Sequence, residues 1–221
     1  TRHHSCGFPR LPWSSQPLQC PVLFATIQVV PFDTAGQSYR CDPVSPDVVT
    51  GHWCALELDW AREVLSAFEP AASGSVEPFR RSHRLSDAHA YLAQRALVDS
   101  IRSGAVQDVT VVEETAIGLL ERLLSGRSVP VRRAIGRSTL TAVHHVEQWL
   151  SLRAHEPLSL IDLSRAANLS VFHLCRAFRA ITGRTIGGYR QQLRLRAALD
   201  EVRDGTRPLI DIALDAGFSS H

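Results

Sequence analysis

The sequence predicts a mainly α protein that carries a short β region near its N-terminal end. Apolar side chains recur at helical spacing through most of the chain after Asp59, whereas residues 1–55 are rich in Pro, Gly, Ser and β-forming side chains. Near the C-terminal end, capping residues separate two short helical patterns by a tight turn, which is the helix-turn-helix arrangement. We therefore expect an all-α C-terminal domain, preceded by a helical hairpin and by the remnant of a β domain.

Two segments of the N-terminal region have the composition of strands, Val22–Val30 and Gly51–Asp59. Two or three short strands are too few to form a stable sheet by themselves. We therefore expect residues 1–58 to be part of a β domain that begins before this chain does.

Residues 59–126 are predicted to be helical. Ser86 is a candidate N-cap for one long helix, and Gly126 follows the end of a second. Two consecutive helices with a short connection suggest an antiparallel hairpin, which can serve as a dimerisation surface. We expect a homodimer for this reason. The basic stretch 127–137 is expected to be the linker to the last domain.

The last domain is expected to begin at residue 138 and to be helical throughout. Ser138 is a candidate N-cap for its first helix. Ser159 and Asp162 have the spacing of a capping box, and Ser170 can cap the following helix. Within this domain, 138–221, the expected helices span residues 138–153, 159–167, 171–182, 188–203 and 209–216.

The net charge of the chain is only +2, but its basic residues are unevenly distributed. Residues 165–196 contain no acidic side chain and seven arginines: Arg165, Arg176, Arg179, Arg184, Arg190, Arg194 and Arg196. A cationic patch of this density attracts polyanions in a salt-dependent way. The alternative is a solvated helix face without a partner, although such faces usually mix both signs of charge.

Membrane insertion and secretion are not indicated by the sequence. The longest apolar run, residues 21–32, is shorter than the roughly 18 to 20 residues that a membrane-spanning helix needs. No signal peptide opens the chain. We therefore expect a soluble, cytoplasmic protein that does not contact a membrane.

Metal binding and catalysis are not indicated either. The five cysteines, Cys6, Cys20, Cys41, Cys54 and Cys175, include no C-x-x-C pair, which favours free thiols over a zinc site. The chain has no glycine-rich phosphate loop, and no nucleophile stands in a recognisable triad. We expect no metal, no cofactor and no enzymatic activity.

The helix expected at residues 171–182 has two different faces. Leu174, Phe178 and Ile181 share one face, at the spacing of a stripe that packs against a core. The opposite face carries Phe172, Cys175, Arg176 and Arg179. In a DNA major groove, Arg can bond the O6 and N7 atoms of guanine, and Phe can contact a thymine methyl group. An ordinary amphipathic surface helix would show the same pattern, so periodicity and charge leave both interpretations open.

The stretch Leu163–Ala198 closely resembles the DNA-binding domain of AraC-type (AraC/XylS) transcription regulators, and it reads LSRAANLSVFHLCRAFRAITGRTIGGYRQQLRLRAA. The family's second signature follows as Ile210–Ala213 and Gly217–Ser219. One departure is Ile186, where the family commonly has Pro. A match over about 55 residues is far more specific than a short motif. The matching residues are Ala166, Leu169, Ser170, His173, Leu174, Arg176, Phe178, Arg179, Gly183, Tyr189, Arg194, Leu195, and Ala197 or Ala198.

The resemblance implies a sequence-specific DNA-binding regulator of transcription. It implies two helix-turn-helix units joined by the long helix at 188–203, so that two recognition helices enter successive major grooves of DNA. Because the chain ends at His221, the second unit is expected to be incomplete. The base-contacting residues implied are Phe172, Cys175 and Arg176. The phosphate-contacting residues implied are Ser170, His173, Arg179 and Arg194.

The resemblance also implies what precedes the DNA-binding domain and what the protein contacts. Residues 1–58 would be the remnant of a cupin-like domain for a small-molecule effector, and 59–126 would be the dimerisation region. The implied partners are double-stranded DNA at a promoter operator, RNA polymerase and the effector. The alternative is a fragment that does not bind DNA and acts only through effector binding or dimerisation.

Overall fold

The computed structural model describes residues 3–17, 23–44, 50–69, 77–79, 81–126 and 135–218. The chain divides into two compact units, Thr1–Ser128 and Val129–His221. Each unit has buried apolar side chains of its own. Most of the expected linker, residues 127–134, lies outside the described residues.

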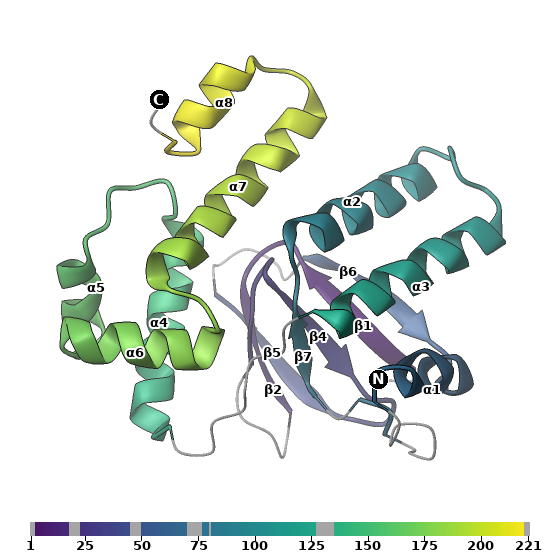
Figure 1. The fold of residues 1–221 in the computed structure, drawn as a ribbon, viewed down its shortest axis with the longest axis horizontal. Coiled ribbons are helices and arrows are strands. Elements are labelled where there is room, and N and C mark those ends of the chain that lie inside the picture. The colour runs from purple at the N-terminus through teal and green to yellow at the C-terminus, as the bar shows by residue number, and fades with distance from the viewer. Residues whose placement is uncertain are drawn as a thin grey trace. The chain divides into compact units, whose positions relative to one another are not determined.

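The first unit contains two antiparallel sheets (Figure 1). One has the order β6-β1-β4-β7 and the other has the order β3-β2-β5. The strands are β1 (His4–Pro9), β2 (Trp13–Pro17), β3 (Leu23–Ala25), β4 (Val29–Asp33), β5 (Tyr39–Pro43), β6 (Gly51–Leu56) and β7 (His83–Leu85). The expectation of two or three strands was therefore wrong. Strands β1 and β4 are buried along their whole length, so they lack the polar–apolar alternation by which a half-exposed strand is recognised.

The two expected strands also differ in detail. The segment Val22–Val30 is interrupted by a turn, in which the amide of Val29 donates to the Thr26 carbonyl at 2.8 Å. That turn separates β3 from β4, and Val22 lies outside the described residues. The strand expected at Gly51–Asp59 ends at Leu56, because the next helix already begins at Leu58.

Three helices of the first unit lie in the part of the chain that the structure describes: α1 (Leu58–Ser66), α2 (Ala88–Arg102) and α3 (Val109–Ser125). Asp87 caps α2 by accepting a hydrogen bond from the Ala90 amide, so the expected cap at Ser86 was one residue too early. One core contains the apolar side chains of α3, such as Leu120 and Leu123, together with Phe32 of β4. Residues from both sides of position 58 thus share one core.

In its described residues, the second unit has five helices: α4 (Arg137–Leu152), α5 (Leu160–Ala166), α6 (Val171–Thr182), α7 (Ile186–Asp204) and α8 (Leu209–Asp215). The expected caps at Ser159 and Ser170 are confirmed, since each hydroxyl accepts a backbone N–H three residues later. The cap expected at Ser138 was wrong: α4 begins at Arg137, after Gly136.

Helix α7 begins two residues before the expected start at Gly188. Thr185 caps it by accepting a hydrogen bond from the Gly188 amide at 3.1 Å. Ile186 is therefore the first residue of the helix, which is the position that tolerates proline best. Its side chain is buried, so this departure from the family pattern contributes to the core of the unit. No described helix is long and apolar enough to cross a membrane.

Candidate nucleic-acid interface

The turn between α5 and α6 fixes the orientation of α6 relative to α5. Asn168 adopts a left-handed conformation with φ 51°, which Asn tolerates better than most residues. The Leu169 amide then donates to the Ser164 carbonyl at 3.0 Å, which closes the end of α5. Ser170 begins α6 by accepting a hydrogen bond from the His173 amide at 3.2 Å. Helix, turn and helix are thus held by local hydrogen bonds.

The inner face of α6 is anchored in the core of the second unit. Leu174 and Phe178 are fully buried, as the sequence predicts, while Ile181 is half-buried. The ring of Phe178 meets the ring of Tyr189 on α7 edge to face, with 5.3 Å between centroids. Val143 on α4 is also fully buried. This packing prevents α6 from rotating about its own axis.

The outer face of α6 presents an aromatic ring and cations to solvent. Phe172 is 71% exposed, and Arg176 lies one turn further along the helix. The Arg176 guanidinium carbon lies 5.4 Å from the centroid of the Phe172 ring, which is within range of a cation–π contact. This contact limits the conformations of both side chains before any partner arrives.

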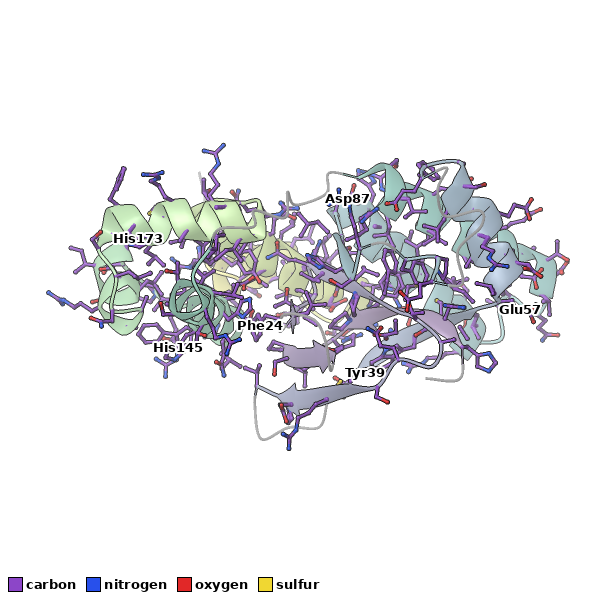
Figure 2. All side chains as sticks on the ribbon, turned by 90° about the horizontal axis from the view of Figure 1, so that it is seen from below. Phe24, Tyr39, Glu57, Asp87, His145 and His173 are labelled. Carbon is purple, nitrogen blue, oxygen red and sulfur yellow. The ribbon has the colours of Figure 1, made fainter. Side chains whose placement is uncertain are left out.

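Four more of the expected contact residues lie on the same helix or at its start. His173 and Arg179 are exposed, Ser170 is exposed, and Cys175 is half-buried. Figure 2 shows that side chains, several of them ending in nitrogen, stand off the surface of the helix that bears His173. Six of the seven expected contact residues are therefore brought together along α6.

A hollow of about 470 Å³ adjoins this face. Its lining combines the start of α4 with the first half and middle of α6. The lining residues are Ile135, Gly136, Thr139, Phe172, His173, Arg176, Ala177 and Ala180. A hollow thus lies between the start of α4 and this side of α6.

Arg194 is not placed with the other six residues. Its guanidinium donates to the backbone carbonyls of Ala154 at 2.6 Å, His155 at 3.3 Å and Gly217 at 2.8 Å. The neighbouring Arg190 also donates to the Ala154 carbonyl, at 2.8 Å. Arg190 and Arg194 therefore link the α4–α5 connection to α7, and Arg194 also links it to Gly217, which follows α8. Arg194 is a structural residue in this arrangement.

The expected cationic patch is consequently smaller than the sequence indicates. Of its seven arginines, three are exposed: Arg165, Arg176 and Arg179. Arg196 is fully buried, and Arg184, Arg190 and Arg194 are half-buried. Counting charges along the chain could not separate arginines that stabilise the fold from those that face solvent. The exposed charge is concentrated on α5 and α6.

The sequence did not predict the burial of two ionisable side chains of α4. Burial raises the pKa of Glu147 to about 8, although a hydrogen bond with Tyr189 acts in the opposite direction. Burial also lowers the pKa of His144 to about 4. Both groups are therefore mostly uncharged at neutral pH, and they add little to the field at the outer face of α6. Within the described residues, no group of three or more His, Cys, Asp or Glu side chains could hold a metal ion.

Comparisons with known proteins point to the same part of the chain. Residues 163–221 match a family model described as a helix-turn-helix domain. Regulatory protein SoxS of Salmonella typhimurium strain LT2 is 36% identical over 73 residues, which cover 33% of this chain and 68% of SoxS. The right origin-binding protein of Escherichia coli strain K12 is 39% identical over 72 residues, which cover 33% of this chain and 25% of that protein.

One solved structure is similar over most of the chain but only distantly. The crystal structure of ToxT from Vibrio cholerae O395 aligns with 99% of this chain and 81% of ToxT. The sequence identity is 9% and the TM-score is 0.37. The sequence relatives therefore carry the family assignment.

Proposed function

Because this chain belongs to the AraC/XylS family of transcription regulators, we propose that α6 is the element with which it reads DNA sequence. The regulators of this family bind DNA and are generally not enzymes. The observation that carries the proposal is the outer face of α6, where Phe172 is 71% exposed beside the Arg176 guanidinium. A helix that is anchored on one face and exposes such side chains on the other suits the major groove.

Phe172, Cys175 and Arg176 are the proposed base-contacting residues. Arg176 can donate two hydrogen bonds to the O6 and N7 atoms of one guanine. Phe172 provides an apolar surface for a thymine methyl group, and its contact with the guanidinium orients Arg176. Cys175 lies between them in the sequence and would contact the same groove through its half-buried thiol.

Ser170, His173 and Arg179 are the proposed phosphate-contacting residues. Ser170 and His173 lie at the start of α6, where the first backbone N–H groups of the helix and the helix dipole favour an anion. Arg179 lies near the other end of the helix and is exposed. Contacts with phosphates on both sides of the groove would set the register of α6 without reading the sequence. Arg194 is left out, because its donors already serve backbone carbonyls.

The first unit is proposed to carry the effector and dimerisation functions. Its separate core, to which residues on both sides of position 58 contribute, favours one small-molecule-responsive domain over residues 1–126, followed by a linker at 127–137 and a DNA-binding domain at 138–221. The helices α2 and α3 expose Ile101, Val109 and Val111, which favours contact with a second copy of the chain.

RNA polymerase is the proposed partner at the promoter, and the cytoplasm is the proposed location.

The direct test of the proposal is selection from a library of randomised DNA duplexes. The protein is expected to enrich one sequence, and to bind that duplex more tightly than a shuffled duplex of the same composition. Arg176→Ala should lose about 1 to 3 kcal/mol of this preference. Arg40→Ala, which removes a highly exposed arginine of the first unit, is the matched control and should keep it.

Arg179→Ala is expected to behave differently from Arg176→Ala. Removal of a phosphate contact weakens binding to all duplexes by a similar factor and reduces the slope of log K against log salt by about 1. If the protein enriches no sequence and binds neither duplex at low salt, the alternative of a fragment without DNA-binding activity is correct.

A further inference from the structure

Two cysteines that are far apart in the sequence face each other in the first unit. Cys6 on β1 and Cys54 on β6 are directly opposite in the antiparallel register. Directly opposite residues in such a pair point to the same face of the sheet, with Cα atoms about 4.5 or 5.5 Å apart. Disulfides form at Cα separations of roughly 4.4 to 6.8 Å. Either type of pairing therefore brings the two side chains within reach of a bond.

The two thiols differ in their access to solvent. Cys6 is 4% exposed and belongs to the core between the sheet and the helices. Cys54 is half-buried and lies on β6, the edge strand of its sheet. Cys54 also packs against this core, but its position on the edge strand gives it a route to solvent that Cys6 lacks. Each sulfur is the other's hydrogen-bond partner.

The hydrogen bond makes the accessible thiol the more acidic of the two. It lowers the pKa of Cys54, while the same bond and burial raise the pKa of Cys6 well above its usual range. The thiolate is the nucleophile in thiol–disulfide exchange. The more exposed cysteine is thus also the one that ionises first.

We propose that Cys6 and Cys54 form a thiol–disulfide redox site, in which Cys54 attacks a small-molecule disulfide and Cys6 resolves the product. The Cys54 thiolate bonds to one sulfur of the disulfide and expels the other half as a thiolate, which leaves a mixed disulfide. Cys6 then loses its proton and attacks Cys54, which expels the second half. The protein is oxidised by two electrons, the small disulfide is reduced to two thiols, and β1 is covalently joined to β6.

The other described cysteines do not share this arrangement. Cys41 on β5 is opposite Ser15, in the second sheet. Burial raises the pKa of Cys41 to about 11, which disfavours its thiolate. Cys175 lies on α6 in the other unit. Cys41→Ser is therefore a suitable control.

The experiment treats the full chain with oxidised glutathione and maps its disulfides by mass spectrometry of peptides under non-reducing conditions. We expect a Cys6–Cys54 peptide pair in the wild type and in Cys41→Ser. In Cys6→Ser, glutathione should remain attached to Cys54, because nothing resolves the mixed disulfide. In Cys54→Ser, Cys6 should stay unmodified. Oxidation should raise the Tm of the first unit by roughly 10 °C, and dithiothreitol should reverse this rise.

Three results would overturn the proposal. The first is a wild-type protein in which glutathione stays on Cys54 although Cys6 is present. The second is a protein in which Cys54 joins Cys41 or a second chain instead. The third is a Cys54→Ser variant whose Cys6 reacts as fast as Cys54 does in the wild type. Circular dichroism of each variant before oxidation establishes that the comparison is made between folded proteins.

Discussion

The two phenylalanines of α6 have opposite environments although they lie on the same helix. Phe178 is fully buried and packs edge to face on Tyr189, whereas Phe172 is 71% exposed beside Arg176. The sequence predicts this difference, because Phe178 shares its helical face with Leu174 and Phe172 does not. The same residue type can therefore pack in the core at one position and be exposed for contact with a partner at another.

Alanine substitution should separate the two roles. Phe178→Ala is expected to lower the free energy of unfolding by about 3 to 5 kcal/mol, because it leaves a cavity in the core of the second unit. Phe172→Ala should change it by no more than about 0.5 kcal/mol, because the ring is mostly in solvent. Urea denaturation followed by circular dichroism measures both values. Equal destabilisation by the two substitutions would contradict the assignment of faces.

Glu147 gives the second unit a pH dependence of stability. Its pKa is about 8 in the folded state and 4.5 in an unfolded chain, so the folded state holds the proton more tightly. Stability contributed by this group is complete below pH 4.5 and is lost as the pH rises through 8. The pKa of His144 is lowered from 6.5 to about 4. Because of this group, the stability of the second unit rises with pH between these two values, and the rise stops near pH 6.5.

Of these two groups, only Glu147 changes the stability of the second unit between pH 6.5 and 8. The free energy of unfolding of the second unit should therefore fall by ~2 kcal/mol over this range. Glu147→Gln, which keeps the shape and cannot ionise, should remove the fall. Urea titrations at several pH values measure it. A fall of the same size in the Gln variant would show that another group is responsible.

At the scale of elements, the sequence predicts helices better than strands. The caps at Ser159 and Ser170 were found correctly, because a hydroxyl three residues before an N–H is a local feature of the chain. Strand β1 was missed and β4 was predicted only at its start, because these two strands show no alternation and their pairing joins residues far apart in the sequence. The close approach of Cys6 and Cys54 depends on another pairing of this kind, between β1 and β6.

The hydrogen bonds of Arg190 and Arg194 join α7 to the α4–α5 connection, and those of Arg194 also reach Gly217, which follows α8. This connection was missed because hydrogen bonds to the carbonyls of Ala154 and Gly217 carry no signal in the sequence. Gly217 is required at its position by φ +78° and by the Arg194 guanidinium, which lies 2.9 Å from where a Cβ atom would be. Arginines in a basic stretch therefore cannot be assigned to phosphate contacts by charge alone.

Arg194→Ala is expected to act on stability. Loss of its three hydrogen bonds to backbone carbonyls should lower the free energy of unfolding of the second unit by about 2 kcal/mol. Arg165→Ala, at a highly exposed position on α5, is the matched control and should change it by less than about 0.5 kcal/mol. Thermal and urea unfolding compare the two. A stable Arg194→Ala protein with a reduced salt slope of DNA binding would instead support a phosphate contact.

At the scale of the whole molecule, the chain combines a β-containing unit with an all-helical unit. The all-helical part and its helix-turn-helix were predicted correctly, because contacts between successive helices depend mainly on local patterns. The extent of the β part was not, and one core spans the boundary expected at residue 58. The family assignment came from residues 163–221, the part in which local patterns are most informative.

The outer face of α6 is proposed to read DNA bases, and a comparison of base preferences between two variants measures whether it does. Wild-type protein and Arg176→Ala are each used to select duplexes from the same randomised library, with Arg40→Ala as control. We predict that the Ala variant loses preference at one base pair, a guanine, and keeps the preference at the other positions. An unchanged preference at every position would contradict the claim.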